Sequence, residues 1–497
     1  MGRESFFYNR FKEHFPYQLT SDQDRLFALM ADFLSGDDHD ILVVNGYAGT
    51  GKTTAIAAVI ESLDDLRPPV RKGGEETGEY EEICVLLAPT GRAAKVLSQY
   101  SGKTAKTIHK CIYRQKSISS DGFGQFSLAP NKQSHKLFIV DEVSLIGIDN
   151  SASHGDASFG TGDLLKDLVT FVRAGNDCRL VLIGDSAQLP PVGLDASPAL
   201  DSGYMDGFGG VMYGCLTEVV RQSKESGILW NATRIRELIT SDPYGNESFS
   251  LDSLGLRSDG FEDVVRINGG ELLDSLNQAY FSEYSKDDAV VLCRSNKRAN
   301  RYNAGIRAQV FYDEERLVKG EKLMIVKNCY QFSGDVKGMD YIANGDIANL
   351  VSIRNFEERY GLSFADARLS FPDYDDTEIV AKVCLDTLES EAASLTYEQQ
   401  NQLYNGVNED YSHITTKKKR YEAVREDPYF NALQLKYANA ITCHKSQGGQ
   451  WSCVFIDNPF WQDELSVDDL KWLYTALTRA VEKVYLVNFK DECFINK

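Results

Sequence analysis

The chain has 497 residues, of which 73 are acidic and 53 basic, for a net charge of −20. At about 100–200 residues per domain, this length predicts two to four domains, and its 42% hydrophobic content is ordinary for a globular protein. No apolar run approaches the roughly 18 residues that a membrane span requires, so we expect no membrane partner. The ten cysteines form no C-x-x-C pair, which favours reduced thiols in the cytoplasm over disulfides or a zinc site.

The first informative segment lies between a predicted buried strand, 41–44, and a predicted helix, 54–60. Residues 46–53 read Gly-Tyr-Ala-Gly-Thr-Gly-Lys-Thr, which matches the pattern G-x-x-x-x-G-K-[ST]. Glycines let the backbone curl so that its N–H groups point at a phosphate, and the following helix presents its positive end. Lys52 would reach the β- and γ-phosphates, and the Thr53 hydroxyl would bind Mg²⁺. The predicted nucleotide-binding residues are Gly46, Tyr47, Ala48, Gly49, Thr50, Gly51, Lys52, Thr53 and Thr54.

Basic residues are concentrated in two stretches, although the chain as a whole is acidic. Residues 88–116 contain seven basic side chains and residues 293–307 contain five, and neither stretch contains an acid. The net charge argues against a nucleic-acid partner, but local clusters of cations are what a phosphate backbone needs. The two stretches therefore predict a local phosphate-binding track.

Two later strands end in side chains that suit a triphosphate site. Asp141 and Glu142 follow the predicted strand 137–140. One carboxylate can anchor the Mg²⁺ shell and the next can polarise the attacking water. Gln188 follows the strand 180–183, and its amide can hydrogen-bond a γ-phosphate or orient water without adding charge. We predict Asp141 as a metal ligand, and Glu142 and Gln188 as catalytic residues.

Strand-like apolar runs fall into two groups, before about residue 220 and after about residue 285. Helix-like segments such as 91–100 and 467–478 alternate with them. Such alternation predicts parallel sheets with ligands at the carboxyl ends of the strands. We therefore predict an α/β fold with two cores.

Some stretches interrupt this alternation. Residues 111–135 are polar and contain glycine, which predicts a hairpin. Residues 309–431 form a long insertion, in which Asn344-Gly345-Asp346 lies between β-like runs and predicts a small barrel or hairpin. Its later part, 388–425, reads as exposed helix. Residues 64–82 read as a loop.

Eight segments, taken in chain order, resemble the motifs of superfamily 1 helicases, and within them the RecD-like branch, superfamily 1B. The segments are 19–23, 46–53, 88–95 with 107–109, 141–144, 184–188, 216–222, 442–448 and 474–480. A phosphate-binding loop alone occurs in many enzymes, whereas this ordered set is specific. The resemblance implies a DNA helicase that uses ATP and Mg²⁺ and is built on two RecA-like cores.

The resemblance also implies a division into domains. The hairpin stretch matches the position of the family's pin, which splits the duplex, and the long insertion matches its SH3-like accessory domain. The implied units are a first RecA-like core of 1–110 and 136–220, a pin of 111–135, a second RecA-like core of 221–308 and 432–497, and an SH3-like and helical insertion of 309–431.

Further site residues are implied by the same resemblance. Gln23 would read the adenine edge, and Gln447 would join the nucleotide site. Arg221 and Arg479 would join Lys52 in catalysis as arginine fingers that grip γ-phosphate charge in the transition state. The implied DNA-binding residues, which would mostly contact phosphates, are Thr90, Arg92, Lys95, Thr107, His109, Phe123, His444 and Ser446.

Because Arg479 follows the second group of strands, the resemblance implies that ATP lies between the two cores and that their closure completes the site. Phe123 or Phe126 would be the apolar wedge of the pin, or else an ordinary packed aromatic.

The residues and the resemblance together predict an ATP-dependent, 5′→3′ single-strand DNA translocase and helicase. It would act as a monomer on single-stranded and tailed duplex DNA, with its polarity implied by the resemblance alone. An RNA helicase remains an alternative, because phosphate contacts ignore the 2′-hydroxyl. A second alternative is a non-hydrolysing, nucleotide-gated switch that binds a partner through residues 309–431. The sequence leaves open the protein partners and any role in DNA replication, recombination or repair.

Overall fold

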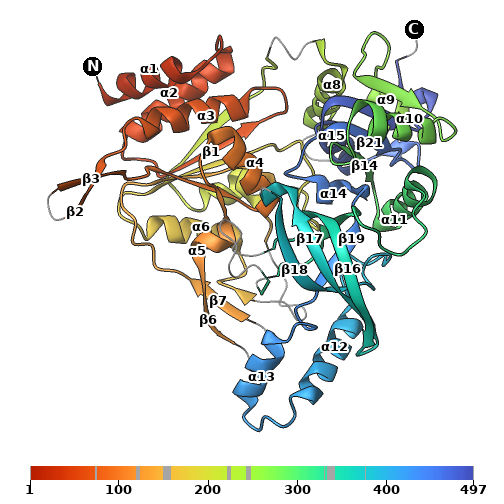
Figure 1. The fold of residues 1–497 in the computed structure, drawn as a ribbon. Coiled ribbons are helices and arrows are strands. Elements are labelled where there is room, and N and C mark those ends of the chain that lie inside the picture. Colours follow the sequence, from red (N-terminus) through yellow and green to blue (C-terminus); the bar gives the residue numbers. More distant parts are fainter. Residues whose placement is uncertain are drawn as a thin grey trace.

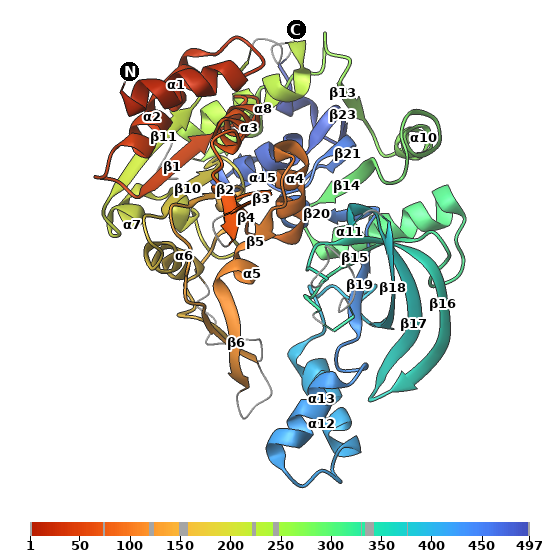
Figure 2. The same cartoon turned by 60° about the vertical axis from the view of Figure 1, so that its left-hand side comes forward.

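The computed structural model describes most of the chain. The described residues are 2–72, 75–118, 124–148, 158–220, 225–241, 248–329, 331–332, 342–374 and 376–495. They form two helix-flanked parallel sheets, a closed barrel, a three-stranded sheet and two short ribbons. Figures 1 and 2 show the two larger sheets in the upper part of the molecule, with the barrel and a helical arm below them.

The first parallel sheet has the strand order β11-β1-β10-β8-β4-β5. Its strands are β1 (Ile41–Gly46), β4 (Cys84–Ala88), β5 (Lys106–Thr107), β8 (Leu137–Val140), β10 (Arg179–Gly184) and β11 (Val211–Leu216). The central strands are apolar along nearly their whole length because helices cover both faces. One face packs against α1 (Arg3–His14), α2 (Ser21–Ser35), α3 (Lys52–Asp64) and α4 (Gly91–Ser101). The other packs against α5 (Ile108–Ile112), α6 (Leu164–Arg173) and α7 (Ser202–Asp206).

The second parallel sheet has the order β13-β23-β21-β14-β20. Its strands are β13 (Val264–Ile267), β14 (Ala289–Cys293), β20 (Ala440–Thr442), β21 (Trp451–Asp457) and β23 (Ala480–Val487). Its helices are α8 (Gly227–Ser241), α9 (Leu251–Leu254), α10 (Leu272–Gln278), α11 (Asn296–Ile306), α14 (Cys443–Ser446) and α15 (Val467–Leu477). The two parallel sheets confirm the predicted α/β fold with two cores.

A closed barrel follows the first part of the second core. It consists of β15 (Lys322–Ile325), β16 (Ile347–Arg359), β17 (Leu362–Phe371), β18 (Thr377–Cys384) and β19 (Leu433–Tyr437). Between β18 and β19 the chain forms an arm of two helices, α12 (Tyr397–Asp410) and α13 (Lys417–Glu426). Leu403, Val407 and Val424 of the arm pack against Leu362 and Phe364 of the barrel. Both the barrel and the helical part are present where the sequence predicts them, although the barrel extends to Tyr437.

The predicted hairpin consists of β6 (Tyr113–Ile118) paired antiparallel with β7 (Gly124–Leu128), and β9 (Ser158–Phe159) extends it. Phe126 packs against the apolar cluster of the first core, so it is a packed aromatic there. Phe123 lies outside the described residues. The expectation of a loop over 64–82 is wrong in part, because β2 (Pro69–Lys72) and β3 (Glu75–Tyr80) form an antiparallel pair.

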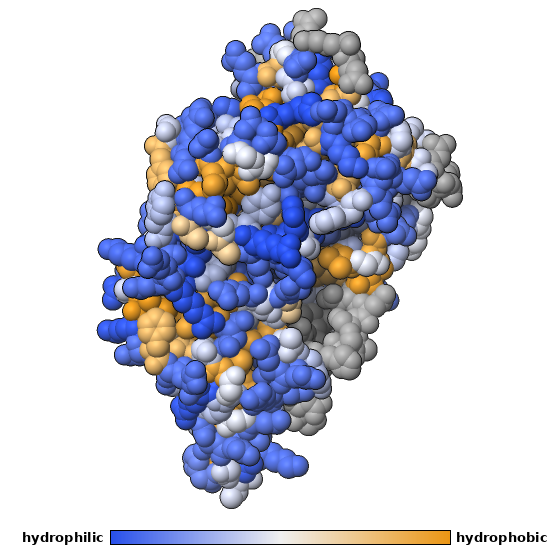
Figure 3. Space-filling view, turned by 90° about the vertical axis from the view of Figure 1, so that its right-hand side faces the viewer, coloured by the Kyte–Doolittle hydropathy of each residue, from blue (hydrophilic) through white to orange (hydrophobic). Residues whose placement is uncertain are grey.

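The remaining ribbon pairs β12 (Phe249–Ser250) with β22 (Glu464–Leu465). On the face shown in Figure 3, hydrophilic side chains cover most of the surface, with smaller apolar patches between them. Within the described ranges, no helix combines the length and the apolar character that a bilayer crossing needs.

A buried carboxylate fixes α2 to the sheet edge beside the phosphate-binding loop. Asp22 is 4% exposed, and its Oδ2 accepts hydrogen bonds from Thr217 N at 2.6 Å, Thr217 Oγ1 at 2.9 Å and Glu218 N at 2.8 Å. Burial by itself raises the pKa of Asp22, but these hydrogen bonds outweigh it and lower the pKa to about 2. The ionised carboxylate therefore stabilises the contact between α2 and the end of β11.

Asp22→Asn should destabilise the protein by about 2 kcal/mol at pH 7, since the amide cannot replace a carboxylate that accepts three hydrogen bonds. Because the folded-state pKa lies below the ordinary 3.8, this contribution is complete above about pH 4 and is lost as the pH falls toward 2. Urea unfolding of both proteins at pH 7 and pH 3 measures it. Equal stability at pH 7, or a gap that does not narrow at pH 3, would contradict this role.

Candidate functional site

The phosphate-binding loop connects β1 to α3. Gly49 and Gly51 have φ angles of 74° and 73°, in the left-handed region that glycine adopts without the usual steric cost. A Cβ at Gly51 would also lie 2.3 Å from Gln23 Nε2. The backbone therefore needs glycine at both positions to bring its N–H groups around the amino end of α3, where an anion is favoured.

Lys52 and Thr53 begin α3 at the carboxyl end of the sheet. Lys52 Nζ donates to Gly46 O at 2.8 Å and to Gly184 O at 3.5 Å, so the ammonium group lies between the loop and the end of β10. The side chain of Thr53 is exposed. The two residues are thus placed as the sequence predicts, with a cation inside the loop and a hydroxyl at its mouth.

Asp141 and Glu142 follow β8 directly. Asp141 Oδ2 accepts a hydrogen bond from the Tyr100 hydroxyl at 2.6 Å, and Oδ1 accepts one from Glu142 N at 2.8 Å. Glu142 has a φ of 54°, an uncommon conformation for glutamate. Burial raises the pKa of Glu142, while the charges of Arg479 and Lys52 oppose that rise. The carboxylate therefore lies near cations of both cores.

Two buried acceptor atoms in this region have no hydrogen-bond partner, Glu142 Oε2 and Gln188 Oε1. A buried acceptor without a donor is costly in free energy. A water molecule beside a γ-phosphate could donate a hydrogen bond to each of these two atoms. Among the described residues, no three His, Cys, Asp or Glu side chains converge as a metal-binding cluster. Mg²⁺ is usually bound through one or two protein ligands together with substrate phosphates. Thr53 and Asp141 are the side chains that fit it.

Tyr474, on α15 of the second core, reaches across to the first. Its hydroxyl accepts a hydrogen bond from Ala48 N at 2.9 Å and donates one to Asp185 Oδ2 at 2.7 Å. The side chain is 1% exposed. Neither Tyr474 nor Asp185 is among the predicted site residues, although both lie within motif-like segments. Their contact joins the phosphate-binding loop, β10 and the second core.

Two neighbouring contacts hold the loop after β10 in the same way. Leu189 N donates to Thr475 Oγ1 at 2.8 Å, and Gln447 Nε2 donates to Leu189 O at 2.7 Å. Gln447 therefore contacts the segment that carries Gln188. Its link to the predicted nucleotide site runs through that segment.

Arg479 also belongs to the second core and is 4% exposed. Its guanidinium donates to Thr475 O at 3.3 Å and to Gly449 O at 3.2 Å, and its charge acts on Glu142 and Asp185. A second-core arginine therefore faces first-core carboxylates, as the resemblance implies. Arg221 lies outside the described residues.

Gln23 lies between the start of α2 and the phosphate-binding loop. Its Oε1 accepts from Thr20 N at 3.0 Å to form a capping box at the start of α2, and its Nε2 donates to Thr50 O at 2.9 Å. The amide thus links the start of α2 to the phosphate-binding loop. A pocket of about 760 Å³ beside it is lined in part by Tyr17, Gln18 and Gly51.

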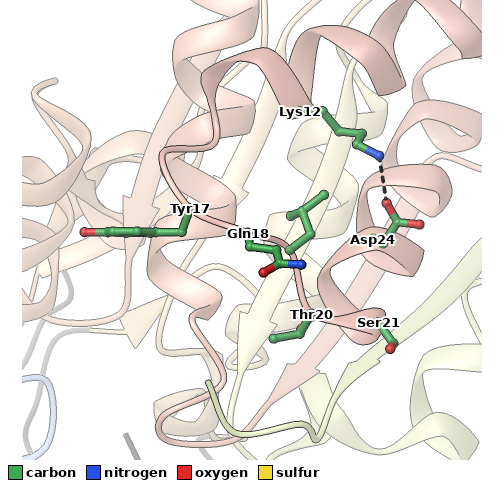
Figure 4. Close-up of a pocket in the computed structure, with 7 residues that line it drawn as sticks. Lys12, Tyr17, Gln18, Thr20, Ser21 and Asp24 are labelled. Carbon is green, nitrogen blue, oxygen red and sulfur yellow. Dashed lines mark hydrogen bonds and ion pairs between the residues drawn. The ribbon is translucent and has the colours of Figure 1, made fainter. Parts of the chain in front are cut away.

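A second pocket, of about 450 Å³, adjoins it on the other side of Thr20. Figure 4 shows Gln18 between Tyr17 on one side and the ion pair of Lys12 with Asp24 on the other. Only the larger of the two pockets is lined by residues of the phosphate-binding loop, Gly49 and Gly51.

A pocket of about 240 Å³ brings several predicted DNA-binding residues together. Thr90, Arg92 and His109 of the first core and His444 of the second line it. The Arg92 guanidinium also lies 4.1 Å from the centre of the Trp451 ring. Residues of the barrel segment that the sequence did not identify complete the wall, namely Asn328, Ala343, Asn344 and Gly345.

Other predicted DNA-binding residues lie elsewhere. Lys95 Nζ donates to Pro372 O of the barrel at 3.3 Å. Thr107 is 5% exposed and its hydroxyl caps α5. Ser446 is 0% exposed, and its hydroxyl donates to Cys443 O at 2.7 Å. The expectation that Thr107 and Ser446 face a single strand of DNA is therefore not met, because both hydroxyls form hydrogen bonds with nearby backbone groups.

The second basic stretch, residues 293–307, is not a phosphate track. Most of its cations form ion pairs with acids that are distant in sequence: Arg294 with Asp469, Lys297 with Glu391, Arg298 with Asp457 and Arg307 with Glu321. The prediction is wrong because these acids come from α15, the arm linker, the carboxyl end of β21 and the start of the barrel, which only the fold brings close.

Comparison with known proteins gives matches in both cores. Residues 18–237 match a family model described as an AAA domain, and residues 437–487 match a UvrD-like helicase C-terminal domain. The ATP-dependent DNA helicase Dda of Enterobacteria phage T4 is 26% identical over 360 residues, which cover 70% of each chain. The RecD2 DNA helicase of Deinococcus radiodurans is 35% identical over 165 residues, which cover 33% of this chain but 18% of RecD2.

Among solved structures, a Pif1 helicase from Bacteroides matches with a TM-score of 0.45 and 16% identity, covering 97% of this chain and 95% of that one. The motif order, the two parallel cores and the two family models agree with the relatives of the RecD-like branch. These matches support a superfamily 1B helicase related to Dda.

Proposed function

We propose that the chain hydrolyses ATP between its two cores to move 5′→3′ along single-stranded DNA and to unwind tailed duplexes. The observation that carries this proposal is the composite site, in which the phosphate-binding loop of one core meets Tyr474 and Arg479 of the other. The names of the relatives, Dda and RecD2 DNA helicases, support DNA over RNA.

In this proposal the first core binds the nucleotide and activates water. The loop N–H groups and Lys52 would hold the β- and γ-phosphates, and the unpaired Oε2 of Glu142 would accept a proton from the attacking water. Gln188 would hydrogen-bond the γ-phosphate. When bound, Mg²⁺ supplies charge neutralisation at the phosphate oxygens, and Thr53 and Asp141 would hold it.

The second core completes the site on closure. Arg479 would grip the charge that develops on the γ-phosphate, and we retain Arg221 as a second finger on the basis of its motif. Gln447 would act through its hydrogen bond to Leu189. The base of ATP would lie in the pocket beside Gln23, which shapes the loop.

The strand would cross both cores at the pocket lined by Thr90, Arg92, His109 and His444. Such side chains can hold a phosphate backbone without reading sequence.

Residues 111–135 would form the pin, and we retain Phe123 as its wedge. We retain the proposed domain limits, with 309–431 as the accessory insertion, and propose a monomer. The ten cysteines are all free thiols, which supports a cytoplasmic location.

Loss of a catalytic charge should abolish strand-stimulated ATP turnover. Lys52→Ala, Glu142→Gln and Arg479→Ala should each lower the turnover rate by about a hundredfold or more, because each removes a group that stabilises transition-state charge or activates water. Phosphate release with saturating single-stranded DNA measures this. Binding of a fluorescent ATP analogue by Glu142→Gln is the control for a folded nucleotide site, and turnover retained in any variant would show that its residue has another role.

Polarity and substrate are tested with tailed duplexes. Unwinding should require ATP and a 5′ single-stranded tail, since the proposed motor pulls itself along that tail toward the junction. Matched DNA duplexes with a 5′ tail, a 3′ tail or no tail, and RNA versions of each tail, measure it by strand separation. Preference for the 3′ tail would remove the proposed direction, and equal action on RNA tails would favour the RNA helicase.

A further inference from the structure

Helix α4 runs from the pocket proposed for the DNA strand, here called the strand pocket, to Asp141, the proposed metal ligand. Thr90 caps its first turn through a hydrogen bond from Ala93 N at 3.2 Å, and Thr90, Gly91 and Arg92 line the strand pocket. Tyr100 lies in its last turn. With 11 residues, the helix spans about 16 Å at 1.5 Å per residue.

At the far end of α4, the Tyr100 hydroxyl donates to Asp141 Oδ2 at 2.6 Å. The ring packs against the apolar cluster of the first core. The side chain is therefore held by packing, and its polar end is directed at the carboxylate.

The main chain of Asp141 is anchored separately. Its N–H donates to Leu87 O of β4 at 3.0 Å, as part of the ladder between β4 and β8. Oδ1 is bonded to the adjacent Glu142 N. Since the sheet holds the backbone and Glu142 N holds Oδ1, the Tyr100 hydroxyl is in a position to set the direction of the other carboxylate oxygen, Oδ2.

The first turn of α4 touches the parts that surround the strand pocket. A Cβ at Gly91 would lie 2.9 Å from Ala343 Cβ of the barrel segment, and a Cβ at Gly448 of the second core would lie 3.1 Å from Ala93 Cβ. The barrel segment and the second core therefore lie directly against the first turn of α4, and a displacement of either one acts on the helix. A short, well-packed helix carries such a displacement to its other end.

We propose that Tyr100 is a positioning residue that couples occupancy of the strand pocket to the orientation of Asp141. A strand held at Thr90, Arg92 and His444 would shift the first turn of α4, and the Tyr100 hydroxyl would carry that shift to the metal ligand. Strand binding would thereby set how well Mg²⁺ and the triphosphate are held for hydrolysis. This inference rests on the proposed function.

Tyr100→Phe tests it, because it removes the hydroxyl and keeps the packed ring. The ratio of ATP turnover with saturating single-stranded DNA to turnover without DNA should fall about tenfold, the effect of one hydrogen bond to a charged group. The Mg²⁺ concentration that half-saturates binding of a fluorescent, non-hydrolysable ATP analogue in the presence of DNA should rise by a similar factor. Affinity for the single strand, measured by fluorescence anisotropy, should stay unchanged.

Tyr302→Phe is the matched control. Tyr302 makes the same kind of bond, from its hydroxyl to Asp457 Oδ1 at 2.7 Å, but within the second core and away from the nucleotide loop. Its removal should leave both the stimulation ratio and the Mg²⁺ dependence unchanged. In an Asp141→Asn background, Tyr100→Phe should cause no further change in the Mg²⁺ dependence, because the bond acts through that carboxylate.

The outcomes separate this inference from the proposed function. Wild-type protein without strand-stimulated turnover would contradict the proposed function itself. Normal stimulation in the wild type together with an unchanged ratio in Tyr100→Phe would overturn the coupling role. An equal loss of basal and stimulated turnover in Tyr100→Phe would also overturn it. Tyr100 would then hold Asp141 in place whether or not DNA is bound.

Discussion

The hydroxyl of Tyr474 is the contact on which the arrangement of the nucleotide site depends. It accepts a hydrogen bond from Ala48 N of the phosphate-binding loop and donates one to Asp185 Oδ2. In a buried setting, each of these groups would be costly to leave unpaired. The second core therefore satisfies polar groups of the first, and separation of the cores exposes them to water. The same helix leads to Arg479, so the contact that aligns the cores also sets the distance between Arg479 and Glu142.

The charge of the chain has meaning only through its distribution. Lys52 lies in the phosphate-binding loop and Arg92 lines the pocket between the cores, whereas most cations of 293–307 form ion pairs within the protein. Ion pairs such as Arg307 with Glu321 join the second core to the barrel and are largely buried. A chain with a net charge of −20 can thus hold a polyanion, since a few unscreened cations in a pocket outweigh distant surface acids.

The barrel is part of the strand pocket as well as an appended unit. Its segment around Asn344 lies beside Thr90 and Arg92, and Lys445 Nζ donates to Asn344 Oδ1 at 2.7 Å. Lys95 reaches the barrel at Pro372. The pocket therefore has walls from three units, and movement of any one of them changes its shape. The arm, α12 and α13, extends from the far end of the barrel on the side of the molecule where β6 and β7 project (Figures 1 and 2).

The sequence by itself determined the two parallel cores, and it predicted a hairpin, a barrel or hairpin with a helical part in the long insertion, and the candidate site residues. Buried parallel strands are continuous apolar runs, and the loop at 46–53 depends on glycines whose spacing is visible without a structure. Only the tertiary structure decided what the polar side chains contact. Arg298 forms an ion pair with Asp457, and the buried Ser446 hydroxyl bonds to Cys443 O. Gln23 donates to Thr50 O of the loop, and Tyr474 donates to Asp185. These pairings join residues up to hundreds of positions apart, and a side chain's role depends on which partner packing brings within about 3 Å.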